Sequence, residues 1–163
     1  MKRWLRKGQA VVTDIVVAFV LFMLLMLIVL FILHYYMDKL KVDEEFNDLS
    51  FRAMRIADFL AFSPGIPDNW TSTSYTQVPG LVWQDRDVSY WKLLNFTSLS
   101  VAQVKGFFGI GSYDFSLQFG YTNGSSLAYF GDAFTQFKNL SATSRREVMY
   151  YNQSAYFDFT IWR

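Results

Sequence analysis

The 163-residue chain contains no cysteine and a single histidine, His34. Without cysteine it has no disulfide, no zinc–thiolate site and no cysteine nucleophile, although this absence does not fix the compartment. One histidine cannot complete a multi-histidine metal site, and as the base of a serine triad it would lie far from the later serines. It fits better as a residue of the water interface, because two tyrosines follow it.

Other signs of catalysis are also missing. The Gly109-Ile110-Gly111 stretch lacks the rest of a dinucleotide fingerprint, so no cofactor is expected. Asp85 and Asp87 could bind a cation, but two acids in a loop are more often simply solvated. The sequence therefore predicts a protein that is not an enzyme.

Charge, proline and glycine are all absent from the 19 residues Ile15–Leu33. At about 1.5 Å per residue this run forms a helix of roughly 28 Å, close to the hydrocarbon thickness of a bilayer. A helix without a polar face is either a membrane span or the dry core of an assembly. We expect it to be both in turn, first in the membrane and then in an assembly.

Basic residues are concentrated before this run, at Lys2, Arg3, Arg6 and Lys7. They predict a cytoplasmic N-terminus and an external C-terminal domain. Beyond residue 8, 15 − 4 = 11 basic groups face 14 acidic ones, which disfavours a nucleic-acid partner. An ordinary signal anchor also fits these charges. A signal peptide cut after the run fits less well, because the run is long and ends in His34-Tyr35-Tyr36.

The helical pattern continues beyond the apolar run. An apolar stripe recurs at intervals of 4, 3, 4, 3 and 4, formed by Val42, Phe46, Leu49, Ala53, Ile56 and Leu60. Ser63-Pro64-Gly65 ends the pattern, so we expect one helix from near Asp14 to near Phe62. The stripe should pack on the domain that follows, and a coiled-coil partner is the alternative.

The remainder predicts an α+β fold, in which the long N-terminal helix packs against a small antiparallel β-sheet domain. Alternating apolar residues at 113–121, followed by Asn123-Gly124, indicate a strand and a hairpin whose return strand is 126–130. A second hairpin joins 147–151 to 155–162. A short strand at 81–83 and a helix over 99–108, capped by Ser98 or Ser100, complete the pattern.

The junction Arg6-Lys7-Gly8-Gln9, directly before the apolar helix, resembles the class III signal of archaeal type IV pilin precursors. Three later stretches also resemble this family: Ser63–Trp70, Tyr113-Asp114-Phe115, and the run from Arg145 to Asn152 that precedes Ile161-Trp162. Residues 72–107 carry no such motif. The resemblance implies that a prepilin peptidase cuts between Gly8 and Gln9, leaving a leader (1–8), a helix (9–62) and an extracellular β-rich domain (63–163).

The resemblance implies a structural subunit of a type IV pilus-like surface filament, or a minor pilin-like protein. Its partners would be the membrane before assembly, the peptidase, and copies of itself joined through the helix. Asp14 would either cap the helix start or pair with a neighbour's N-terminal amine, as in bacterial pilins. The competing hypothesis is a monomeric, single-pass surface module that binds a ligand through its aromatic domain.

Asparagine glycosylation signals are frequent. Five of the six asparagines begin an Asn-x-Ser/Thr triplet: Asn69, Asn95, Asn123, Asn139 and Asn152. All lie on the expected outer side of the membrane, where glycans would also cover exposed aromatic surface. The alternative is that asparagine, serine and threonine merely occur together in turns.

Overall fold

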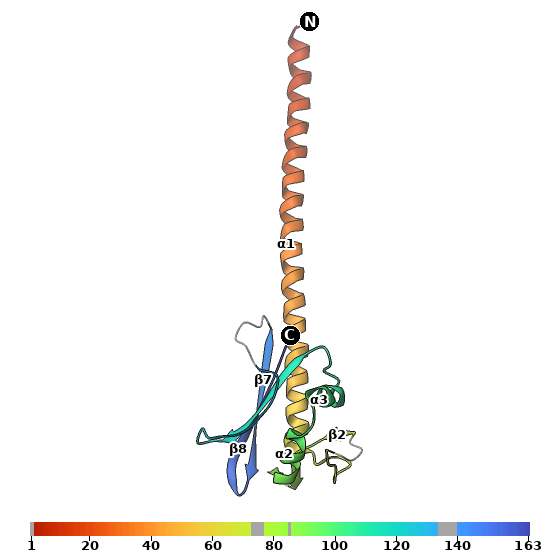
Figure 1. The fold of residues 1–163 in the computed structure, drawn as a ribbon. Coiled ribbons are helices and arrows are strands. Elements are labelled where there is room, and N and C mark those ends of the chain that lie inside the picture. Colours follow the sequence, from red (N-terminus) through yellow and green to blue (C-terminus); the bar gives the residue numbers. More distant parts are fainter. Residues whose placement is uncertain (1, 73–76, 85, 134–139) are drawn as a thin grey trace. The chain divides into compact units, whose positions relative to one another are not determined.

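The structure, a computed structural model, describes residues 2–72, 77–84, 86–133 and 140–163, with residues 2–12 as backbone alone. The chain forms two compact units, Met1–Glu44 and Glu45–Arg163. One helix, α1 (Lys2–Phe62), provides the first unit and opens the second (Figure 1). The expected α+β architecture is confirmed, since the second part of α1 packs against β-strands.

Helix α1 begins at Lys2, so the expected start near Asp14 is wrong. The leader contains no proline, and apart from Gly8 it is rich in residues that tolerate a helix well, so nothing stops α1 before the apolar run. The expected end at Phe62 is confirmed, because Ser63 donates its N–H to Phe59 at 2.9 Å and Pro64 follows.

The apolar stripe of α1 is buried only in part. Leu49, Ala53, Ile56 and Leu60 are buried in the core of the second unit, as expected. Val42 and Phe46, at the beginning of the stripe, remain 55% and 46% exposed. The protein's own fold therefore covers the stripe from Leu49 onward and leaves its beginning uncovered.

A six-stranded sheet faces α1 in the second unit, in the order β3-β4-β7-β8-β5-β6. Its strands are β3 (Val82–Gln84), β4 (Asp87–Val88), β5 (Asp114–Tyr121), β6 (Ser126–Gly131), β7 (Ser141–Tyr150) and β8 (Gln153–Trp162). The sheet is antiparallel, as expected, except that β4 runs parallel to β7 through Asp87 and Met149. Long connecting segments separate these two strands in sequence, and parallel pairing requires such a connection.

The expected apolar rows of β5 and β8 are confirmed, although Ser116 and Trp162, which were expected on the opposite face, are buried as well. Phe115, Leu117 and Phe119 of β5 are buried opposite Ile161, Phe159 and Phe157 of β8. Within this face the rings of Phe119 and Phe157 stack with centroids 4.6 Å apart. The paired aromatic rows form the centre of the core and fix the register of the two strands.

Both expected hairpins are present. Asn123-Gly124 lies in the turn between β5 and β6. The β7–β8 hairpin turns through Tyr151 and Asn152, whose φ angles of 50° and 58° match a two-residue type I′ turn. β7 is longer than expected because its pairing with β8 begins at Ser141.

The smaller elements lie at the end of α1 and before β5. β1 (Gly65–Ile66) pairs with β2 (Val78–Pro79) in a separate two-stranded sheet. Helix α3 (Val101–Phe108) was expected, and Ser100 caps it by accepting the N–H of Gln103 at 3.2 Å. Helix α2 (Tyr90–Thr97) was not expected. Its start has no side-chain cap from Ser89, and only a few of its residues are buried, so its sequence carries only a weak helical signal.

Candidate functional site

The apolar run of α1 is the first candidate for a functional site. Among the described residues, one helix is long and apolar enough to cross a membrane, the stretch Thr13–Phe62 of α1. The eighteen large side chains of Ile15–Leu33 are 41% (Val29) to 74% (Phe31) exposed. The chain therefore carries an uncovered apolar helix that must be covered by lipid or by another molecule.

Gly8 and Gln9, the expected cleavage residues, lie inside α1. Glycine disfavours the interior of a helix by about 1 kcal/mol relative to alanine. Gly8 is therefore the point in this first stretch where the helix opens at the least cost. The sequence motif remains the basis for placing a cut there.

Asp14 is exposed and lies well inside α1. Because the helix begins at Lys2, Asp14 does not cap its start in the uncut chain, and that interpretation is wrong. If the chain were cut after Gly8, Asp14 would become the sixth residue of a helix beginning at Gln9. Only then would its carboxylate lie near the positive end of the helix dipole and near a free amine.

The structure separates the glycosylation candidates by accessibility. Asn69, Asn123 and Asn152 are exposed in turns of the second unit, and Oδ1 of Asn123 accepts the N–H of Ser125 at 2.9 Å. Asn95 is half-buried within α2, and its Oδ1 accepts the Ser72 hydroxyl at 3.5 Å. Asn139 lies outside the described residues.

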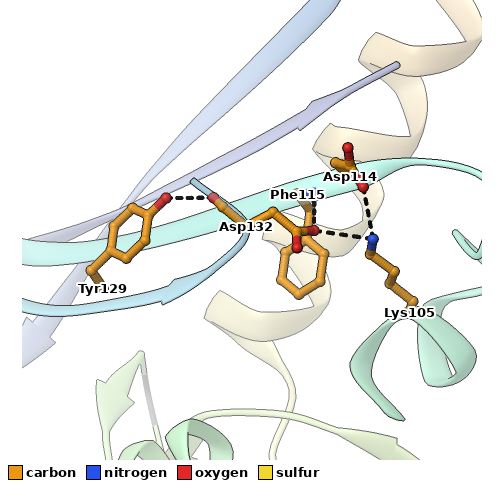
Figure 2. Close-up of polar contacts among 5 residues, drawn as sticks. All are labelled: Lys105, Asp114, Phe115, Tyr129 and Asp132. Atoms are coloured by element: carbon orange, nitrogen blue, oxygen red, sulfur yellow. Dashed lines mark hydrogen bonds and ion pairs between the residues drawn. The ribbon is translucent and has the colours of Figure 1, made fainter. Parts of the chain in front are cut away.

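A cluster of one lysine and two aspartates joins α3 to the sheet, as Figure 2 shows. Nζ of Lys105 lies 2.9 Å from Oδ1 of Asp114 and 3.0 Å from Oδ2 of Asp132. The Tyr129 hydroxyl donates to the backbone oxygen of Asp132 at 2.6 Å. Burial on its own lowers the pKa of Lys105, but its bonds to Asp114 and Asp132 outweigh burial, so the pKa lies above its ordinary value. The cluster fastens the end of β6 to α3.

A buried lysine, Lys92, lies beneath the turn that ends α1. Nζ of Lys92 donates to the carbonyls of Pro64 at 2.7 Å and Val82 at 2.9 Å, and the residue is only 5% exposed. Nε1 of Trp70 donates to the carbonyl of Gly80 at 2.9 Å. Burial lowers the pKa of Lys92, and the charge of Asp68 partly offsets this shift. A lysine with a lowered pKa could act as a nucleophile. Here, however, the amine donates to two backbone carbonyls, and its burial leaves a substrate no access to it.

Neither cluster was predicted from the sequence. Tyr113-Asp114-Phe115 and the Ser63–Trp70 run drew notice as motifs, but their cationic partners lie elsewhere in the chain. Within the described residues, no three His, Cys, Asp or Glu side chains gather where a metal could bind. Asp87 is exposed, Asp85 lies outside the described residues, and His34 pairs with Asp38 one helical turn away at 3.4 Å.

No protein-family model, curated protein or solved structure matches this chain.

Proposed function

We propose that the chain is a structural subunit of a surface filament of the archaeal type IV pilus kind. In this proposal it is made as a membrane precursor with its N-terminus in the cytoplasm. A prepilin peptidase then removes residues 1–8, and the subunits polymerise through α1. The second unit, carrying glycans on its exposed sequons, lies on the outside of the filament.

One observation carries the proposal: α1 is a single helix whose first part is uncovered and apolar, while its last part is built into a folded domain. Transfer of the eighteen large side chains of Ile15–Leu33 from water to an apolar environment is favourable by on the order of 30 kcal/mol. Lipid provides this cover in the membrane. Copies of the same helix provide it equally well, so the exchange is nearly neutral and close packing decides whether it occurs.

The leader supports processing before assembly. Cleavage after Gly8 would remove all four basic residues that precede the apolar run. A helix freed of these charges can leave the cytoplasmic surface of the membrane at lower cost. The new amine at Gln9 could then pair with Asp14 of a neighbouring copy, which would give the otherwise apolar contact a defined register.

A single-pass surface module is the second candidate, and exposed aromatic residues favour it. Trp83, Trp91 and Tyr151 of the second unit are 71%, 69% and 67% exposed. Tryptophan and tyrosine are the residues most often found at the centre of binding surfaces. In this case α1 would remain in the lipid as an anchor and no cleavage would be needed.

The two candidates are distinguished by substitutions in the middle of the apolar run, measured as filament yield against membrane-bound subunit. Leu25→Arg costs roughly 2.5–3.5 kcal/mol for insertion, but in a helix bundle the charge recurs in every subunit without access to water. We expect Leu25→Arg to abolish filaments while some membrane-bound subunit remains, and Phe22→Ala to weaken filaments without affecting insertion. Leu25→Met is the matched control and should assemble like wild type. Normal polymerisation of the Leu25→Arg protein would overturn the filament proposal.

A further inference from the structure

A surface groove of about 650 Å³ lies beside the last turns of α1 in the second unit. Its walls are formed chiefly by Arg52, Arg55, Phe59 and Phe62 of α1 and by Phe107 and Phe108 at the end of α3. The phenylalanines make the groove apolar, and the two guanidinium groups give it positive charge. An occupant of this groove should therefore combine apolar side chains with carboxylates.

The charges around the groove are not all neutralised by the chain itself. Asp58 is paired with Arg146, and Arg52 is paired with Asp48 at 2.8 Å. Arg55 lies over the ring of Phe51, 5.7 Å from its centroid, and makes no ion pair with any described residue. The groove thus presents at least one guanidinium group that is available to a carboxylate.

A segment with the complementary composition lies earlier on the same helix. Val42 and Phe46 are four residues apart, so they share one face of α1, and both are exposed. At about 100° per residue, Asp43 and Glu45 lie on either side of this face and Glu44 lies opposite. These acids are exposed and make no ion pair with any residue that the structure describes. This segment is the beginning of the apolar stripe, which the protein's own sheet leaves uncovered.

We propose that the groove receives residues 42–46 of a second copy of this chain. Val42 and Phe46 would pack on the groove phenylalanines, while Asp43 and Glu45 would face Arg52 and Arg55. The inference rests on the proposed filament, and it assigns the contact that sets the spacing of subunits along the filament axis.

The geometry of this contact matches an open filament. Groove and segment occupy different places on one helix, so each copy offers one of each and the contact is head-to-tail. Head-to-tail contacts add copies without closing unless the rotation happens to complete a ring. Glu45 and Arg55 are ten residues apart, so parallel neighbours would be offset by about 15 Å along the helix axis.

Charge reversal tests the proposal in the full-length protein, in cells that assemble filaments. The Asp43→Lys/Glu45→Lys double variant and the Arg52→Glu/Arg55→Glu double variant should each lower filament yield by about tenfold or more, since attraction is replaced by repulsion. Both sets of reversals in one chain should restore the yield. Glu44→Lys is the matched control, because it reverses a charge on the opposite face, and it should assemble normally.

Cross-linking tests the contact directly, and the absence of native cysteine makes the result unambiguous. Two single-cysteine proteins, Phe46→Cys and Phe107→Cys, are expressed together with tags of different length. Any disulfide between them joins two copies. We expect a mixed dimer after oxidation of isolated filaments, and none when Glu44→Cys replaces Phe46→Cys.

The outcomes separate the two proposals. Restored assembly together with a mixed dimer supports the groove contact. Three results would overturn the groove contact and leave the filament proposal intact. They are normal filaments from either double variant, a combined reversal that does not raise the filament yield again, and a Phe46→Cys protein that cross-links only to itself. A wild-type protein that forms no filaments would overturn both.

Discussion

Gly80 provides a sharp test of the packing at the end of α1. A Cβ atom at this position would lie 2.8 Å from the carbonyl carbon of Ser63, and closer still to its oxygen and to the amide nitrogen of Gly65. All of these are backbone atoms, so no side chain can move aside. We therefore expect Gly80→Ala to force the two backbone segments apart by about 1 Å.

The cost of this movement can be worked out from the contacts at the site. Overpacking of a rigid site costs about 1–3 kcal/mol. The same shift disturbs the 2.9 Å bond from Trp70 to the Gly80 carbonyl and the pairing of Gly65 with Pro79, at about 1 kcal/mol for each lost hydrogen bond. We expect a total loss of about 3–5 kcal/mol, or a fall of about 10–20 °C in the melting temperature.

Gly106 is the matched control for this experiment. It lies within α3, and a Cβ atom there would meet nothing within 4 Å. Gly106→Ala should therefore stabilise the protein by about 0.5–1 kcal/mol, because alanine favours the helix. The assay is thermal unfolding of the full-length protein in detergent micelles, followed by near-ultraviolet circular dichroism of the packed aromatic rings. Equal melting temperatures for wild type and Gly80→Ala would refute this reading of the turn. A loss of stability in Gly106→Ala would contradict the open space around Gly106.

Three further predictions concern processing, glycosylation and pH. Protein from isolated filaments should begin at Gln9 by intact mass, and Gly8→Leu should leave an uncut precursor; residues 1–8 on filament protein would contradict this. In native-host material, peptide mapping should find glycan on Asn69, Asn123 or Asn152 more often than on half-buried Asn95, whereas highest occupancy at Asn95 would oppose the accessibility argument. Lys92, with its lowered pKa, holds its proton less tightly in the folded state, so stability should rise with pH between that lowered pKa and 10.5, the ordinary value. Urea unfolding at pH 7 and 10 measures this rise, and an identical rise in Lys92→Met would exclude Lys92 as its source.

Local sequence signals predicted the parts of the fold that short-range chemistry determines. Ser63-Pro64-Gly65 placed the end of α1 and Asn123-Gly124 placed a hairpin. Ser98 and Ser100 both marked the start of α3, and the structure has Ser100 as the cap. Each depends on backbone conformation or capping within a few residues. The predicted start of α1 was wrong because the helix propensity of the leader outweighs the capping signal at Thr13-Asp14.

The clusters and the parallel pairing could not be predicted, because distant segments form them. Lys105, Asp114 and Asp132 meet only when α3, β5 and the end of β6 are packed together. Lys92 looks like an ordinary surface lysine until the turn at Pro64 closes over it. The groove at Arg55 likewise depends on Phe107 and Phe108, about fifty residues further along the chain.

The place of β8 in the sheet has a consequence for how the protein is made. This strand is the last in sequence order, yet it pairs with both β5 and β7 in the interior of the sheet. Until residues 153–162 have left the ribosome, both of those strands expose unpaired edges, and the aromatic rows of β5 have no partner. The apolar run of α1 emerges much earlier and can enter the membrane first. If α1 spans the membrane with its N-terminus in the cytoplasm, as proposed above, the second unit crosses the membrane unfolded and folds afterwards on the far side.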